Sequence, residues 1–188
     1  MQLAPHDALS TSLRQTQVAQ DQYTNFVNTL RNFLERIEDG QREETQKVYL
    51  RDFLQSTFYA EYDMPLGEND IDLAIRLHKS PTSRFAVLFE VKTTTNRNEM
   101  ISRENLNRKA LQELLLYYLR ERVLNKNTDL RHLVVTNLYE YFIFDAQEFE
   151  ESFYKPLREV FLDYDAGRKT FTLTRDFYTE IAAPAIDA

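Results

Sequence analysis

Apolar and polar positions alternate in a way that predicts a β-hairpin near the middle of the chain. Residues 71–77 alternate strictly, as expected for a strand with one buried face. Phe85–Val91 is almost entirely apolar, which is typical of a strand covered on both faces. Residues 78–84 between them have the composition of a turn. A turn centred on Pro81 places position 72 opposite position 90.

Apolar residues at helical spacing predict helices before and after this hairpin. Residues 21–37 and 43–58 carry apolar positions at intervals of three and four, and Gly40 between them suits a helix C-terminus. The elements expected further along are a helix over 105–124, strands over 133–136 and 139–145, and helices over 146–154 and 175–188.

The order of these elements predicts an α/β fold with a central mixed β-sheet flanked by helices. We expect an N-terminal helical arm over residues 1–40 and a main domain over residues 41–188. The 188 residues are enough for one domain with a substantial core in addition to such an arm.

The hairpin register places charged side chains together. Asp72 and Glu90 face each other on neighbouring strands, and Lys92 shares the face of Glu90 because the two positions differ by two. Carboxylates opposed in a poorly hydrated sheet repel, and a divalent cation between them reverses the sign of the interaction. Mg²⁺ prefers such oxygen ligands, and Lys92 is placed to orient a water or to neutralise a phosphate. The pattern predicts metal-assisted hydrolysis of a phosphodiester.

Two carboxylates at the start of the helix over 43–58 are candidates for the outer part of this site. Glu43 lies seven residues before Leu50 and projects onto the same face, whereas Glu44 lies about 100° round the helix. Interaction with the helix dipole is an alternative explanation for either carboxylate. Both interpretations stay open from spacing alone.

Composition narrows the classes of function. The absence of cysteine excludes disulfides, zinc–thiolate sites and a thiol nucleophile, and three glycines are too few for a glycine-rich phosphate loop. We find no secretory signal and no apolar run of the ~20 residues that a membrane span needs, so we expect a cytoplasmic protein. A net charge of −7 counts against tight autonomous binding to DNA, because that binding neutralises phosphates with basic side chains.

The acidic and basic residues together resemble the signature of the PD-(D/E)XK nuclease superfamily. The residues that carry the resemblance are Asp72, Glu90, Lys92, Glu43 and Glu44. The proline of the signature is absent, and Ile71 precedes the aspartate. The resemblance implies a restriction-endonuclease-like core.

The helix after the signature departs from the superfamily pattern. That helix commonly carries Gln-x-x-x-Tyr, where this chain has Glu113 followed by Tyr117, with Gln112 one residue early. The resemblance therefore implies a supporting role for these three residues that differs in detail from the usual one.

A closer resemblance is to the N-terminal nuclease domain of Type IIG and Type I-like single-chain restriction–modification enzymes. It covers residues from about Glu43 to the end of the chain, and its main stretches are residues 42–54, 69–75, 88–92, 104–122, 132–150 and 176–182. It implies Mg²⁺-dependent cleavage of double-stranded DNA, with Mn²⁺ as a substitute. Methyltransferase and target-recognition domains would follow in the full-length chain, and dimerisation on DNA would allow both strands to be cut.

The same resemblance implies a role for each site residue. Asp72, Glu90 and the backbone of Val91 would hold the metal, Lys92 would assist the nucleophile, and Glu43 or Glu44 would supply the outer acidic group. Two alternatives remain: an inactive nuclease-like binding or assembly module, and a nuclease for repair or recombination. The latter needs its own basic surface, which the net charge disfavours.

Overall fold

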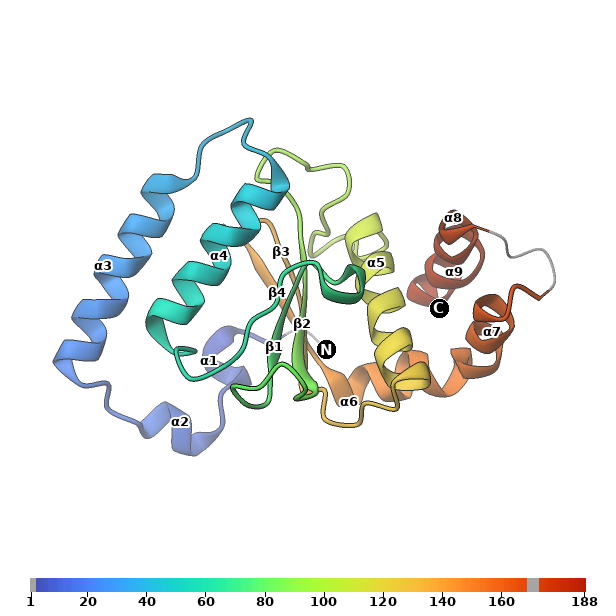
Figure 1. Cartoon of the computed structure of the whole chain (residues 1–188), viewed down its shortest axis with the longest axis horizontal. Helices are drawn as coiled ribbons and strands as arrows, with labels where there is room; N and C mark the ends of the chain where they lie inside the picture. The colour runs from blue at the N-terminus through green and yellow to red at the C-terminus, as the bar shows by residue number, and fades with distance from the viewer. Residues whose placement is uncertain (1–2, 169–172) are drawn as a thin grey trace.

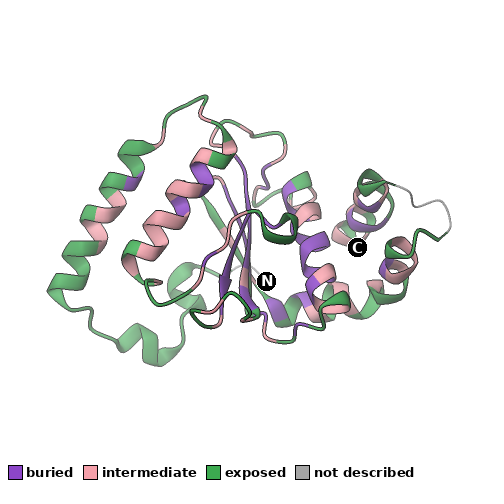
Figure 2. Ribbon diagram, viewed as in Figure 1, coloured by how far each residue is buried: buried purple, intermediate pink, exposed green. Residues whose placement is uncertain are grey.

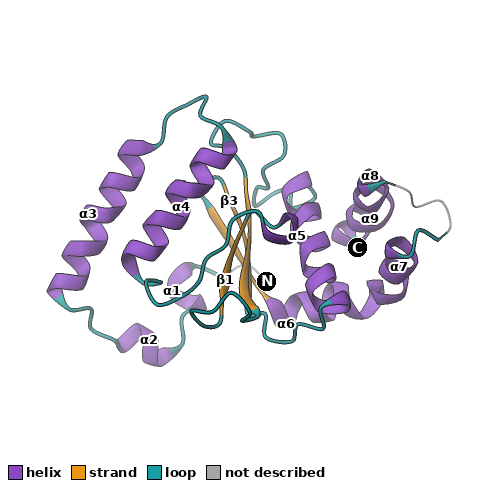
Figure 3. Ribbon diagram, in the orientation of Figure 1, coloured by secondary structure: helices purple, strands orange, loops and turns teal. Residues whose placement is uncertain are grey.

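A four-stranded mixed β-sheet lies at the centre of the molecule, with helices on both of its faces (Figures 1 and 3). The computed structural model describes residues 3–168 and 173–188. The strands lie in the order β1 (Leu73–Arg76), β2 (Phe85–Val91), β3 (His132–Thr136) and β4 (Tyr141–Asp145). The β2–β3 pair is parallel and the two outer pairs are antiparallel. The predicted α/β class with a mixed sheet is confirmed.

The hairpin has the predicted register. Leu73 pairs with Phe89 and Ile75 with Val87, so the two numbers of each pair are symmetric about Pro81. The first strand is shorter than predicted and begins at Leu73, because the N–H of Ile71 donates to the carbonyl of Glu68 and the carbonyl of Asp72 accepts from the N–H of Gly67, both in the preceding loop. The register also shifts by one residue after Ile75.

One face of the sheet is covered by α3 (Gln20–Arg36) and α4 (Glu43–Thr57), whose bounds lie within one residue of those predicted. Figure 1 shows these helices side by side on one side of the strands. Phe33 of α3 and Leu50 of α4 share a buried cluster with apolar residues of the sheet. Phe58, predicted to lie on the buried face of the second helix, is 64% exposed and ends outside the core.

The other face is covered by α5 (Lys109–Leu119) and by the helices of the C-terminal part of the chain (Figures 1 and 2). These are α6 (Ala146–Phe149), η3 (Glu150–Tyr154), α7 (Lys155–Asp165), α8 (Thr174–Asp176), η4 (Phe177–Ala182) and α9 (Ala183–Asp187). The leucines of α5 form the centre of this second buried cluster.

The long central helix differs from its prediction at both ends. It starts at Lys109 instead of residue 105, and it continues after Leu119 as a wider π-helical segment, η2 (Arg120–Leu124). Glu121, predicted to belong to a solvated helix end, is buried and accepts hydrogen bonds from Asn125 and Asn127. Leu124, predicted to face inward, is exposed.

The remaining helices are short. The segment before α3 contains α1 (Pro5–Ala8) and α2 (Thr11–Gln15), which bury no residue, and η1 (Glu68–Asp70) precedes the hairpin. Residues 1 and 2 of the predicted arm and residues 169–172 of the predicted main domain lie outside the described residues. Within the described part of the chain, no helix combines the length and the apolar composition that crossing a bilayer requires.

Candidate active site

Asp72 lies directly before β1, and the hairpin register puts it opposite Glu90 of β2. The backbone N–H of Val91 donates a hydrogen bond to Asp72 Oδ2 at 2.8 Å. This bond holds the carboxylate of Asp72 against the end of β2, so the two acids meet as the sequence predicted. The family resemblance implies that the backbone of Val91 helps to hold the metal. In the structure the N–H group of Val91 is bonded to Asp72.

Glu90 is almost completely buried, with only 1% of its surface exposed to solvent. Its Oε1 lies 2.6 Å from the Lys92 ammonium, while its Oε2 has no hydrogen-bond partner among the residues that the structure describes. Burial, followed by the charge of Asp72, raises the pKa of Glu90 well above its ordinary value, and Lys92 only partly opposes this. The unpartnered oxygen marks a place where a positively charged group would be favourable.

Lys92 is also buried, at the end of β2 where its backbone N–H donates to the carbonyl of Thr136. Its ammonium lies 2.6 Å from Glu90 and 2.6 Å from Glu113 of α5, with Glu99 at 3.8 Å. Burial alone would lower the pKa of Lys92, but the carboxylates of Glu90 and Glu113 outweigh burial and hold that pKa above its usual range. Lys92 is therefore a fixed positive charge beside the two acids.

Glu43 and Glu44 both contact Lys47, a residue that was not predicted to belong to the site. The ammonium of Lys47 lies 3.2 Å from Glu43 Oε1, 2.8 Å from Glu44 Oε1 and 2.6 Å from Asp72 Oδ1. Lys47 therefore links both glutamates to Asp72. The sequence left open whether Glu43 or Glu44 reaches the site, and in the structure both do so through this lysine. Its position three residues before Leu50, on the buried stripe of α4, is the signal that could have identified it.

Gln46, the residue before Lys47, was also missed. It is fully buried, and within the described part of the chain neither its amide nitrogen nor its amide oxygen has a hydrogen-bond partner. Gln46 lies four residues before Leu50 on α4, so its place on the buried stripe is readable in the same way.

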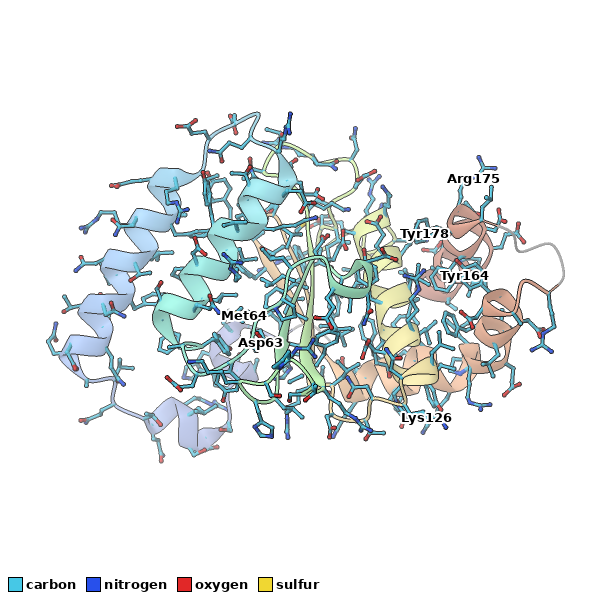
Figure 4. All side chains as sticks on the ribbon, in the orientation of Figure 1. Asp63, Met64, Lys126, Tyr164, Arg175 and Tyr178 are labelled. Carbon is cyan, nitrogen blue, oxygen red and sulfur yellow. The ribbon has the colours of Figure 1, made fainter. Side chains whose placement is uncertain are left out.

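The supporting residues of α5 separate into two groups. Glu113 contacts Lys92, and Tyr117 is buried with its pKa raised by burial and by the charges of Glu90 and Asp72. Gln112 does not join them, because its amide donates to Asn107 Oδ1 at 2.9 Å. Tyr178 of η4, which lies beside α5 in Figure 4, was not predicted to belong to the site. Burial and the charges of Glu113 and Glu90 raise the pKa of Tyr178 above its usual range.

A pocket of about 260 Å³ opens next to these residues. Its lining includes Ile71, which precedes Asp72, and Tyr117 of α5. Arg120 also lines the pocket and pairs with Asp70 at 3.1 Å. The pocket therefore opens beside the residue that precedes Asp72, whereas Asp72 and Glu90 do not belong to its lining.

The donor set suits a hard divalent cation. Asp72 and Glu90 supply carboxylate oxygens, and Glu90 Oε2 is buried without a partner. Mg²⁺ is commonly held by one or two carboxylates, with water completing its shell. Among the residues that the structure describes, no group of three or more His, Cys, Asp or Glu side chains forms a metal cage, so the set fits a sparsely held ion only.

Comparisons with known proteins give a family and no function. Neither the curated proteins nor the solved structures contain a match to this chain. A family model described as a domain of unknown function, DUF7149, matches residues 3–188. Because this match spans nearly the whole sequence, the chain belongs to the DUF7149 family.

Proposed function

We propose that this chain is a Mg²⁺-dependent endonuclease domain of the PD-(D/E)XK type, which hydrolyses phosphodiester bonds of double-stranded DNA in a restriction–modification enzyme. The observation that carries the proposal is the buried carboxylate of Glu90, with one oxygen unpartnered, opposite Asp72 and beside Lys92. A buried acid without a full set of partners is costly, and a bound cation at that oxygen removes the cost.

Each residue has a defined role in this proposal. Asp72 and Glu90 hold the metal, which when bound supplies Lewis-acid polarisation of the phosphate and a more acidic water. Lys92 stays protonated, since its pKa lies above the usual range, and therefore stabilises negative charge instead of accepting a proton. Glu113 positions Lys92 through the 2.6 Å ion pair.

The wider context of the proposal comes from the sequence resemblance. The mixed sheet flanked by helices is compatible with a restriction-endonuclease-like core, which remains part of the proposal. Double-stranded DNA, methyltransferase and target-recognition domains, dimerisation on DNA and a cytoplasmic location belong to it as well. The net charge of −7 favours delivery to DNA by other domains over autonomous binding.

A binding or assembly module is the second candidate, and the ion pairs of the site favour it. Lys47 pairs with Asp72 and Lys92 pairs with Glu90, so each of the two carboxylates has a counter-charge from within the chain. On this hypothesis the chain binds no divalent cation at Asp72 and cleaves nothing.

Plasmid cleavage by the full-length protein in Mg²⁺ separates the two candidates. We expect Asp72→Ala and Lys92→Ala each to lower the cleavage rate by at least about 100-fold, because the first removes a metal ligand and the second removes a positive charge beside the reacting phosphate. The matched controls Asp39→Ala and Lys79→Ala change exposed residues and should cleave as the wild type does. Activity that survives both site substitutions overturns the proposal.

A further inference from the structure

The ammonium of Lys47 is enclosed by carboxylates. Its three N–H donors have three acceptors, Asp72 Oδ1 at 2.6 Å, Glu44 Oε1 at 2.8 Å and Glu43 Oε1 at 3.2 Å. Lys47 is only 5% exposed, so nearly all of its solvation comes from these acids. The ammonium therefore occupies the centre of an acidic pocket, where a bound cation would also be favourable.

Both oxygens of Asp72 are engaged. Oδ2 accepts from the backbone N–H of Val91, and Oδ1 is held by Lys47. A metal ligated by Asp72 needs one of these oxygens, and the bond to Val91 belongs to the backbone of the hairpin. Oδ1 is therefore the oxygen that Lys47 and a metal compete for.

Glu90 Oε2 independently points to a ligand on the other side of the pair. This oxygen belongs to a side chain 1% exposed, and none of the residues in 3–168 and 173–188 provides it with a hydrogen-bond partner. A cation bound between the two acids gains this oxygen, whereas the ammonium of Lys47 contacts Glu43, Glu44 and Asp72. Glu90 Oε2 is thus available to a cation, while Asp72 Oδ1 is occupied by Lys47.

The ammonium of Lys47 can move away from Asp72 without losing its other two carboxylate partners. Of its three partners, Glu44 has a side chain 78% exposed and Glu43 one 31% exposed, so both lie toward solvent. A shift of the ammonium toward these two glutamates releases Asp72 Oδ1 and keeps two carboxylates around the lysine. The exchange therefore avoids leaving a buried ammonium without a counter-charge.

We propose that Lys47 is an internal cation that competes with the divalent metal for Asp72 and so sets the metal affinity of the site. The inference depends on the metal site of the proposed function, and it adds regulation of that site by a residue of α4. A cation of charge +1 held at Asp72 Oδ1 repels a divalent ion at the same oxygen, and poor hydration of the site strengthens this repulsion.

Mn²⁺ binding to the full 188-residue chain tests this competition. The dissociation constant is measured by electron paramagnetic resonance of free Mn²⁺, with circular dichroism to establish that each variant is folded. We expect Lys47→Met and the more polar Lys47→Gln to bind Mn²⁺ at least about tenfold more tightly than the wild type. The matched control is Lys109→Met, which removes one charge near Glu99 and Glu113 without a contact to Asp72 and should shift affinity by less than about threefold.

Asp72→Asn distinguishes failure of this inference from failure of the proposed function. If Asp72→Asn abolishes Mn²⁺ binding while both Lys47 variants bind like the wild type, the metal site stands and the competition is wrong. If no variant binds Mn²⁺, or if Asp72→Asn binds as tightly as the wild type, the proposed metal site is wrong and the inference falls with it. If a Lys47 variant is unfolded without metal, the stabilisation of its folded state by added Mn²⁺ is measured by circular dichroism. That stabilisation must exceed the one that Mn²⁺ gives the wild type.

Discussion

Glu90 carries a conflict between burial and charge. Its side chain is excluded from solvent, it faces the charge of Asp72, and only one of its oxygens is paired, with Lys92. These effects raise its pKa in the folded chain well above the value of a solvated glutamate. The ionised form of Glu90 is therefore less stable in the folded chain than in the unfolded one.

This conflict predicts that Glu90→Gln stabilises the chain at neutral pH. Below about pH 4 the carboxyl is protonated in both states, so wild type and variant should have similar melting temperatures. As the pH rises, the unfolded chain loses this proton first, and the wild type loses stability until the pH passes the folded pKa. Thermal melts by circular dichroism at pH 4, 5.5 and 7.5 should show a growing advantage for the variant.

The exposed Glu104→Gln is the matched control and should show no such trend. A lower melting temperature for Glu90→Gln at every pH would mean that the ion pair with Lys92 outweighs burial. That outcome would place Glu90 among structural residues and weaken the case for a metal ligand.

The residues of the site differ in how far the sequence predicts them. Asp72, Glu90 and Lys92 are predictable because a strand has period two and the turn is symmetric about Pro81, so their relative positions follow from counting. Lys47 is not found this way, because a search for apolar stripes passes over a buried lysine. Its burial depends on Asp72, which lies 25 positions further along the chain and meets it only in the fold.

At the scale of elements, the connection from α5 to β3 is tied to the sheet by one side chain. Asn127 is buried after η2, and its amide nitrogen donates to the carbonyl of Phe85 at 3.0 Å and to Glu121 at 3.2 Å. Its side-chain oxygen accepts from the backbone N–H of Asp129. Asn127 thus joins the end of the helix, the start of β2 and the approach to β3.

Asn127→Ala should lower the free energy of unfolding by about 1–3 kcal/mol, because it leaves a buried carbonyl and a buried carboxylate without that donor. Urea denaturation followed by circular dichroism measures the change. The same substitution at the exposed Asn98 is the control, expected to stay within about 0.5 kcal/mol of the wild type. Equal effects at the two positions would show that Asn127 does not hold this connection.

Element types are predicted better than element ends, and α5 shows why. Apolar spacing continues back to residue 105, which favours a helix start there. In the structure Ser102 and Asn105 exchange backbone hydrogen bonds, and the Ser102 hydroxyl accepts from the Asn105 N–H. Such local turns compete with helix formation, so α5 starts only at Lys109. A periodicity count carries no information about this competition.

At the scale of the whole molecule, the sheet order follows from connection lengths that the sequence displays. The short turn between β1 and β2 requires an antiparallel pair, and the long segment containing α5 allows the parallel pair of β2 and β3. The packing of α3 on α4 is less readable, since it depends on contacts such as the stacked rings of Phe33 and Phe53. The fold class is therefore predictable from the sequence, whereas the packing of the helices on the sheet depends on how individual side chains fit together.

The overall charge leads to the last prediction, which concerns DNA. With 23 basic against 30 acidic residues, the chain has a net negative charge that opposes binding to phosphates, and Lys47, Lys92 and Lys109 are already paired with acids of the site. We expect the isolated chain to bind a fluorescent 30-base-pair duplex with a dissociation constant no tighter than about 10⁻⁴ M at physiological salt. Fluorescence anisotropy across a salt series measures both the affinity and its salt dependence.

On the proposed function a longer protein carries this domain, and that protein should bind the same duplex far more tightly because its other domains would deliver this one to DNA. Micromolar binding by the isolated chain, with a steep loss of affinity as salt rises, would require several phosphate contacts from this chain alone. That result would overturn the tethered-nuclease hypothesis in favour of a repair or recombination nuclease with its own basic surface. The affinity for the duplex and its salt dependence therefore decide between two proposed nucleases that share one set of site residues.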